Sequence, residues 1–125
     1  MRMWMLPMDI MCLGHKMGEH YEIHKHLPSL LSGVKVDGRY RTFPQIQMWS
    51  IVERHDILAR NFNIHKSPIE DPQNTLKQLE KLYPQYFWIN VDLRYNFWDL
   101  WLRCPECRRL MGRNANISKS IIEGE

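Results

Sequence analysis

The sequence contains no long run of apolar residues. No stretch of its 125 residues approaches the roughly 20 consecutive apolar side chains of a membrane-spanning helix. The start of the chain also lacks the apolar segment of about 7 to 15 residues that marks a secretory signal. These absences predict a cytoplasmic protein that does not contact a membrane.

The sequence contains few cysteines, and their number is odd. The three cysteines are Cys12, Cys104 and Cys107. Because a reducing compartment keeps thiols reduced, we expect free thiols and no disulfide framework. Cys104 and Cys107 have the spacing of half a zinc site, whose remaining ligands would have to come from Cys12 or a histidine. We favour the simpler interpretation that both thiols are small apolar core residues and that the protein holds no metal.

A strong excess of one charge is absent as well. The 17 Lys and Arg residues are opposed by 14 Asp and Glu residues, and the whole net charge of +3 lies within residues 1–66. A polyanion would therefore be expected to meet the N-terminal half. The length and the hydrophobic share of 44% are typical of one compact domain over residues 1–125. We expect a monomer whose polar tail, residues 112–125, is frayed.

Residues 10–27 carry a helical pattern that Pro28 is expected to end. Mostly apolar side chains recur every three or four residues and predict the face of the helix that turns inward: Ile10, Leu13, Met17, Tyr21 and His24. Gly14 and Gly18 lie on a flank of this helix, where the missing side chains would let another backbone approach closely. The N-terminal segment is a candidate for that close approach.

The opposite face of the same helix carries four titratable side chains within a narrow line, His15, Glu19, Glu22 and His26. Three interpretations remain open. The line can be a solvated polar face, a metal site built from carboxylate and imidazole ligands, or an acid–base site on a rigid helix. Spacing alone does not choose among them.

The rest of the chain predicts further helices and no strands. Residues 30–44 have the turn signals and interleaved basic and aromatic side chains of an exposed loop, and residues 45–60 read as a second helix. Asp71 and Pro72 form an N-cap pair for a third helix, and Asn90 or Asp92 can cap a last helix that Pro105 must kink or restart. Trp88, Trp98 and Trp101 are expected in the core. The fold class is therefore all-α, with about four helices.

Two blocks of sequence resemble a known family. The first is His15-Lys16-Met17-Gly18-Glu19-His20-Tyr21-Glu22, an H-x3-E-x2-E pattern a short way from Met1-Arg2. The second comprises Arg54-His55-Asp56 and residues 60–68, Arg-Asn-Phe-Asn-Ile-His-Lys-Ser-Pro. Together, in this order, they resemble the bacteriophage pyrimidine dimer DNA glycosylases, the endonuclease V family, over about residues 1–68. If a phage encodes the chain, the cytoplasm is that of its host.

The resemblance implies a small all-α enzyme that needs no cofactor. In the family, the N-terminal α-amine attacks the sugar of a damaged nucleotide, forms a Schiff base and then breaks the strand by β-elimination. The matching catalytic residues here are Met1 and Glu22, with the N-terminal segment lying across the first helix near Gly18 and Glu22. Met1 should be retained, because methionine removal requires a small second residue and Arg2 is large. The arginines that flank the glutamate in well-known members are replaced by Tyr21 and Lys25.

The chemistry of an α-amine agrees with this role. Its ordinary pKa of about 7.7 to 8.0 leaves a useful fraction neutral and nucleophilic near pH 7. We expect Arg2 to lower the pKa of the Met1 α-amine by charge repulsion and Glu22 to raise it. Lysine is the competing nucleophile, and Lys16 and Lys25 lie on the same helix.

The sequence thus predicts a DNA glycosylase with AP-lyase activity on double-stranded DNA containing damaged pyrimidines, above all cyclobutane dimers. Two alternatives remain: a non-catalytic DNA-binding protein on the same scaffold, and a helical metal-binding protein that uses His15, Glu19, Glu22 and His26. The residues expected to contact DNA share positive charge or a place beside Glu22: Arg2, His15, Glu19, Tyr21, Lys25, Lys35, Arg39, Arg41, Arg54, Arg60 and Lys66.

Overall fold

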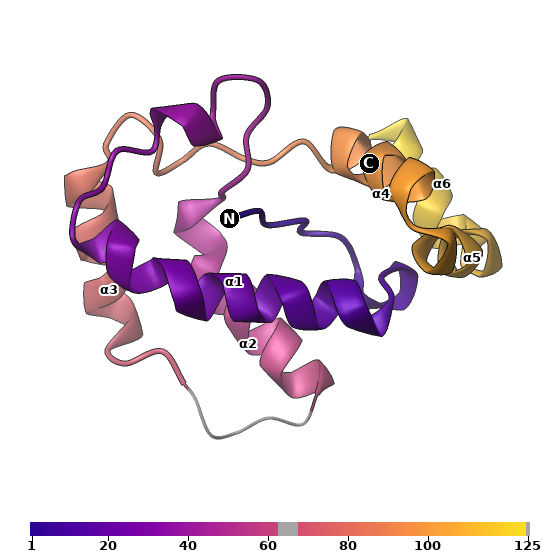
Figure 1. Ribbon diagram of the computed structural model, residues 1–125, viewed down its shortest axis with the longest axis horizontal. Coiled ribbons are helices and arrows are strands. Elements are labelled where there is room, and N and C mark those ends of the chain that lie inside the picture. The colour runs from indigo at the N-terminus through magenta and orange to yellow at the C-terminus, as the bar shows by residue number, and fades with distance from the viewer. Residues whose placement is uncertain (63–67, 125) are drawn as a thin grey trace.

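The protein is helical throughout the part of the chain that the computed structural model describes, residues 1–62 and 68–124 (Figure 1). Its elements are η1 (Met8–Ile10), α1 (Leu13–Leu31), η2 (Asp37–Arg39), η3 (Met48–Ser50), α2 (Ile51–Asn61), α3 (Pro72–Leu82), α4 (Leu93–Arg103), α5 (Pro105–Arg113) and α6 (Ala115–Glu123). The all-α prediction is confirmed, with six α-helices in the described residues instead of about four. None of these helices is long and apolar enough to cross a membrane.

The helices form two groups, each with its own apolar core. Helices α1, α2 and α3 surround one cluster, which includes Ile23, Leu58 and Leu79, whereas α4, α5 and α6 surround a second, which includes Phe97 and Leu100. Figure 1 shows the two groups on opposite sides of the molecule.

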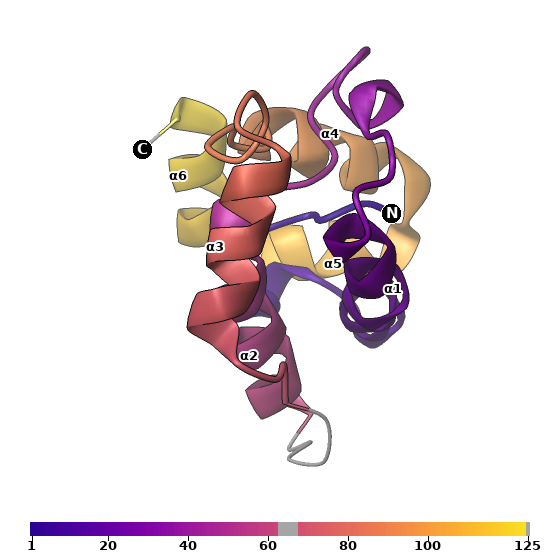
Figure 2. The ribbon, with the colours of Figure 1, turned by 90° about the vertical axis from the view of Figure 1, so that its left-hand side faces the viewer.

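The first twelve residues connect the two groups. Met3 is buried in the first cluster, Trp4 and Leu6 are buried in the second, and Met8 packs against both. The short helix η1 packs on α5, and Figure 2 shows the N-terminus itself beside α1. The N-terminal segment is therefore part of the interior of the fold.

Helix α1 turns the opposite face inward from the one that its apolar periodicity predicts. Leu13, Met17 and Tyr21 are 60%, 53% and 62% exposed, whereas Glu19 and Ile23 are buried. Ile10, in η1, is buried as expected and His24 is half-buried, but the rest of the expected apolar stripe faces solvent, and the titratable line faces the N-terminal segment and α2. This prediction was wrong because a charged side chain can enter an interior when a distant partner neutralises it, and local periodicity does not reveal that partner.

The ends of α1 also differ from the prediction. Cys12 is the N-cap residue, because Met8–Ile10 forms a separate 3-10 turn before the helix. Pro28 lies inside the helix instead of ending it, and α1 continues to Leu31. Pro28 has no N–H to donate to the carbonyl of His24 one turn earlier, and the burial of Leu27 and Leu30 in the first core holds this end of the helix in place.

The later helices begin where their capping residues predict. The Asp71 carboxylate accepts a hydrogen bond from the Asn74 N–H, and Pro72 is the first residue of α3. The Asp92 carboxylate likewise accepts a hydrogen bond from the Tyr95 N–H at 3.0 Å and caps α4. The expected helix over residues 45–60 is divided between η3 and α2.

The C-terminal segment is ordered as helix, which decides between two alternatives at Pro105 and corrects the prediction for the tail. Cys104 has an extended backbone, with φ −124° and ψ 105°, so Pro105 starts a new helix, as one of the two expected alternatives requires. The tail that we expected to be frayed forms α6, whose Ile121 and Ser118 are buried against the second core. The polar composition of this tail concealed an amphipathic helix with a narrow apolar face.

The tryptophans are less buried than expected. Trp88 and Trp98 are 65% and 40% exposed, and Trp101 is half-buried. The core prediction is therefore wrong for Trp88 and Trp98. Large rings gain from partial burial against neighbouring aromatic side chains, as Trp88 does beside Trp49 and Phe87.

Candidate functional site

Backbone contacts place the first residue of the chain in a defined position. The Met3 N–H donates to the Gln45 carbonyl at 2.7 Å, and the Asn96 side-chain amide donates to the Trp4 carbonyl at 3.0 Å. Met5 has a left-handed backbone with φ 58°, which turns the segment between these two anchors and η1. Met1 therefore projects from a segment that is held on both sides.

Arg2 anchors this segment to α4. Its guanidinium donates hydrogen bonds to Asp99 at 2.5 Å and to Asn96 at 2.8 Å, and it lies 3.7 Å from the ring centroid of Trp4. Burial lowers the pKa of the Arg2 guanidinium, and the Asp99 carboxylate opposes that shift. With its charge used inside the protein, Arg2 has a structural part in this conformation, and the expectation that it holds DNA needs correction.

The α-amine of Met1 lies beside the carboxylate of Glu22. The Met1 nitrogen is 3.9 Å from Glu22 Oε2, and the side chain of Met1 is buried. His26 Nε2 is 2.9 Å from the same oxygen, one turn further along α1, but the orientation of the two groups does not make a hydrogen bond. Glu22 Oε2 is thus buried between the Met1 amine and the His26 ring and accepts no hydrogen bond from the described residues.

The surroundings of Met1 favour the neutral amine. Burial and then the positive charge of Arg39 hold the pKa of the Met1 α-amine below its ordinary 8.0. Glu22 raises this pKa and Lys25 lowers it, and the balance remains a lowered value. The expected opposition between a positive charge and Glu22 is therefore present, but Arg39 and Lys25 supply the positive charge instead of Arg2.

A small pocket of about 80 Å³ opens next to the amine. Its lining includes Met1, His26, Lys35 and Arg39, and the remaining lining residues are Ser29, Leu30, Val34, Val36 and Ile46. Two cations thus lie on the same pocket as the amine, an arrangement suited to an anionic group. The pocket combines residues of α1 with residues of the loop that follows it.

The four residues of the titratable line on α1 separate into three different contacts. His15 lies beside the Cys12 thiol, Glu19 pairs with Arg54, and Glu22 lies between Met1 and His26. They do not gather around one point among the described residues, so the structure gives no support to the alternative of a metal site built from His15, Glu19, Glu22 and His26.

Gly18 does not serve the close approach that we expected for it. A Cβ atom at Gly14 or at Gly18 would meet no other atom within 4 Å. The N-terminal segment therefore reaches α1 at Glu22 and not at these glycines. Gly14 and Gly18 lie on the same exposed side of α1 as Leu13 and Met17.

Several residues expected to contact DNA are unavailable to a ligand. Arg54 and Glu19 are 4% and 1% exposed and bind each other, with Arg54 Nε 2.6 Å from Glu19 Oε2 and Arg54 Nη2 2.8 Å from Glu19 Oε1. His15 is half-buried among thiols. The predictions for Arg54 and Glu19 need correction, because a buried and paired side chain cannot also bind a phosphate in this conformation. Contact of His15 with DNA stays a prediction.

The other predicted DNA contacts are exposed. This set comprises Tyr21, Lys25, Lys35, Arg39, Arg41 and Arg60. The ammonium of Lys25 lies 5.9 Å from the ring centroid of Tyr21, so the two residues that flank Glu22 are neighbours on the surface. Lys66 lies outside the described residues. DNA binding by the exposed residues remains a prediction.

The structure also brings together two groups of potential metal ligands, of which the sequence analysis considered the first but favoured a core role for its thiols, and missed the second. Cys12, His15, Cys104 and Cys107 place their donor atoms within 4.8 Å of one another, as do His20, His24 and His55. The core interpretation holds for the buried Cys107, but Cys104 and Cys12 are half-buried and meet it beside His15. The matching spacings Cys12-x2-His15 and Cys104-x2-Cys107 were the available signal for the first group.

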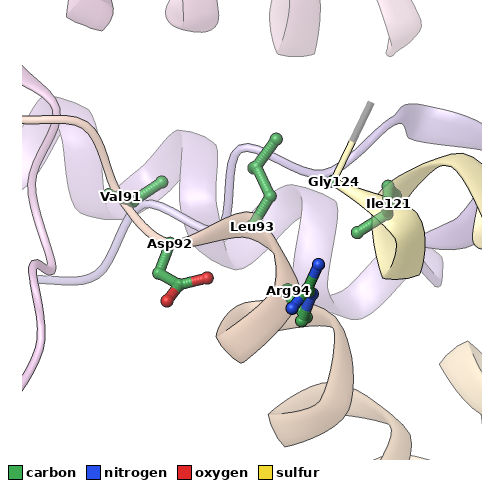
Figure 3. Close-up of a pocket in the computed structure, with 6 residues that line it drawn as sticks. All are labelled: Val91, Asp92, Leu93, Arg94, Ile121 and Gly124. Atoms are coloured by element: carbon green, nitrogen blue, oxygen red, sulfur yellow. The ribbon is translucent and has the colours of Figure 1, made fainter.

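A surface pocket of about 360 Å³ lies apart from these groups, between the start of α4 and the end of α6. Figure 3 shows Asp92, Leu93 and Arg94 on one side and Ile121 and Gly124 on the other. None of the catalytic or DNA-binding residues expected from the sequence lines it. Volume alone therefore does not identify the candidate site, which is marked by the contact between Met1 and Glu22.

Comparisons of the chain with family models, curated proteins and solved structures found no match. A function for the chain is therefore proposed from its own residues and contacts and from the sequence resemblance.

Proposed function

We propose that the protein is a DNA glycosylase with AP-lyase activity that acts on damaged pyrimidines in double-stranded DNA, cyclobutane dimers in particular. The observation that supports this proposal is the position of the Met1 α-nitrogen, 3.9 Å from a carboxylate oxygen of Glu22. An amine and a carboxylate in a partly buried site are the two groups that Schiff-base chemistry on a sugar requires.

The reaction begins with the neutral amine. Because burial and Arg39 hold the pKa of the Met1 α-amine below 8.0, more of it is neutral at pH 7 than in an ordinary N-terminus. The amine attacks C1′ of the damaged nucleotide, the new N–C1′ bond replaces the bond to the base, and the departing base takes a proton. Loss of the amine proton and opening of the sugar ring then give the imine.

Glu22 is the proposed carrier of protons in the later steps. Removal of a C2′ proton by its carboxylate lets the C3′–O bond break, so the 3′ phosphate leaves and the strand is cut. Hydrolysis of the imine by water releases the free amine. Glu22 Oε2 suits this role, because it is buried next to the amine and accepts no hydrogen bond.

The proposal requires Met1 to be the first residue of the mature protein. Arg2 favours this, since removal of the initiator methionine needs a small second side chain. The contacts of Arg2 with Asp99 and Asn96 also fix the position of the residue that follows Met1. An intact-mass measurement of the purified chain tests the requirement directly.

DNA would approach the side that carries the exposed cations. Lys35 and Arg39 line the small pocket beside Met1, and Lys25 is exposed on α1 one turn from Glu22. Positive side chains around the amine can bind the phosphates that flank a damaged nucleotide. The target carbon lies inside a duplex, so binding must also bend or open the DNA.

Strand cleavage by Glu22→Gln and by the matched control Glu53→Gln tests the proposal. Glu53 is an exposed carboxylate on α2, outside the site. On ultraviolet-irradiated duplex and on duplex with an abasic site, we expect Glu22→Gln to lose at least about 100-fold in cleavage rate and to keep its affinity. Glu53→Gln should cleave at the unmodified rate.

The alternative of a non-catalytic DNA-binding protein predicts a different result. In that case the unmodified protein would bind damaged duplex but would not cut it at any concentration. Equal cleavage by the unmodified protein and by Glu22→Gln would contradict the proposed role of the carboxylate.

A further inference from the structure

Three thiols and one imidazole meet where the start of α1 faces the junction of α4 and α5. Cys12 is the N-cap residue of α1, and His15 follows one turn later. Cys104 occupies the break between α4 and α5, and Cys107 lies in the first turn of α5. The four donor atoms, one from each residue, all lie within 4.8 Å of one another.

The separations between these atoms match those of ligands around one zinc ion. Bonds of about 2.3 Å to sulfur and 2.0 to 2.1 Å to nitrogen place the ligands of a tetrahedral zinc ion roughly 3.5 to 3.8 Å apart. Here Cys12 Sγ is 3.8 Å from Cys104 Sγ and 3.2 Å from His15 Nδ1, and Cys107 Sγ is 3.7 Å from the same nitrogen. The other three pairs of donor atoms also lie within 4.8 Å, so a modest closing of the cluster would complete the tetrahedron.

Backbone amides already point at two of the sulfur atoms. The Cys12 N–H donates to Cys107 Sγ at 3.3 Å, and the Cys107 N–H donates to Cys104 Sγ at 3.4 Å. Hydrogen bonds of this kind orient metal-bound thiolates and stabilise their negative charge. They give the cluster the surrounding support that a bound metal needs.

We propose that Cys12, His15, Cys104 and Cys107 form a structural zinc site. Two short spacings, Cys-x2-His and Cys-x2-Cys, supply the four ligands, and a set of four protein ligands leaves no open position for a substrate. The site is therefore one that holds the fold together. It goes beyond the proposed function and does not depend on it.

The position of the site shows which parts of the chain the metal would join. Cys12 ends the segment that begins at Met1, while Cys104 and Cys107 belong to the C-terminal group of helices. The zinc ion would therefore join the two groups at a point where they otherwise meet through η1 and α5. Loss of the metal should loosen the N-terminal segment together with α5.

The histidines His20, His24 and His55 are the competing metal site. They offer three nitrogen ligands within 4.8 Å of one another. However, His55 Nε2 lies 2.9 Å from His24 Nε2, and His55 Nδ1 lies 2.9 Å from Asp56 Oδ1, so hydrogen bonds within the protein already account for His55. This group contains no sulfur, which makes the two sites distinguishable by spectroscopy.

Metal content and a cobalt spectrum of the full chain test the proposal. We expect one zinc ion per chain by elemental analysis after purification without chelator. Replacement by Co²⁺ should give sulfur-to-metal charge-transfer absorption in the near ultraviolet and the strong visible bands of a tetrahedral site. Removal of zinc by a chelator should lower the melting temperature by about 10 °C or more, since a structural metal contributes several kcal/mol to folding.

Substitutions of single residues identify the side chains that bind the metal. Cys104→Ser, at a half-buried position, should remove the charge-transfer absorption and the zinc, and His15→Cys should keep both, because a fourth thiolate can replace the imidazole. His24→Gln is the matched control and should leave metal content unchanged. If a variant fails to fold, the cobalt spectrum of the unmodified chain still decides between thiolate and histidine ligation.

Three results would overturn the proposal. One is a purified chain that neither holds zinc nor binds Co²⁺ with sulfur charge transfer. Another is zinc that persists in Cys104→Ser and disappears in His24→Gln, which would assign the metal to the histidine group. The third is a metal-free chain, purified as it exists, in which a disulfide between Cys12 and Cys104 persists when reductant is added.

Discussion

Arg54 joins α2 to α1 through a two-point ion pair with Glu19, and both side chains are buried. Arg54 Nη2 also donates to the sulfur of Met11 at 3.3 Å, so the pair reaches the end of the N-terminal segment. Both residues belong to the sequence blocks that resemble the glycosylases. Part of that resemblance therefore reports how α1 is held in place and not how DNA is bound.

Arg54→Ala should strongly destabilise the fold. Removal of the guanidinium would leave the Glu19 carboxylate buried without a partner, and breaking a buried pair in this way costs about 3 to 5 kcal/mol. The free energy of unfolding from denaturant titration measures this loss. Arg60→Ala, at an exposed position on the same helix, should change it by less than about 0.5 kcal/mol. A loss below about 1 kcal/mol for Arg54→Ala would show that the pair is dispensable.

An extra residue before Met1 should abolish covalent trapping. The extension turns the α-amine into an amide and moves the new amine away from Glu22, so we expect at least about a 100-fold loss of adduct with abasic duplex after borohydride treatment. The same residue added after the last position of the chain is the control. Peptide mapping should place the adduct of the unmodified protein on Met1. An adduct on Lys16 or Lys25 would contradict the assignment.

Arg39→Gln should raise the pKa of the Met1 α-amine. Burial is the largest cause of the lowered pKa, and the charge of Arg39 is the next. Without that charge the protonated amine is less disfavoured, so less of the amine is neutral at pH 7. The rate at which the amine reacts with an electrophile, followed by intact mass between pH 6 and 9, should fall at pH 7 and its rise with pH should move to higher pH.

Arg41→Gln serves as the control for this pH experiment. Arg41 is exposed on the same loop but is not among the charges that shift the amine. Its profile should coincide with that of the unmodified protein. If Arg39→Gln instead moved the profile to lower pH, the proposed electrostatic role of Arg39 would be wrong.

Affinity for duplex DNA should depend strongly on salt. Five exposed cations remain from the predicted contacts within the described residues: Lys25, Lys35, Arg39, Arg41 and Arg60. At about −0.9 per neutralised phosphate, the slope of log K against log salt should be near −4.5. Arg41→Gln should reduce the slope by about 0.9, and Arg113→Gln, exposed on α5, should not change it. A slope near zero would contradict binding by this surface.

The sequence predicted those parts of the fold that depend on neighbouring residues. Asp71 with Pro72, Asp92, and Pro105 after Cys104 all start helices as expected, because a cap or a missing N–H acts within one turn. The inward face of α1 was predicted wrongly, because Glu19 is neutralised by a residue 35 positions away. Such a pairing is a property of the fold and has no local signal.

The same distinction holds for the candidate site. The pairing of Met1 with Glu22 was expected from the resemblance, and the structure places them 3.9 Å apart. The gathering of Cys12 and Cys104 was considered but not favoured, because 92 residues separate them and either spacing alone indicates only half a site. The source of positive charge near the amine was also missed, because the sequence neighbour Arg2 turns away while Arg39 turns toward it.

The bond between Arg2 and Asp99 spans 97 positions of the chain and so sets an order of events during synthesis. Residues near the start leave the ribosome first, but their partners in α4 emerge only when most of the polypeptide has been made. Until then the amine of Met1 is as exposed to solvent and as mobile as the amine of any unfolded terminus. The proposed nucleophile thus reaches its place beside Glu22 only after the chain has been extended through α4.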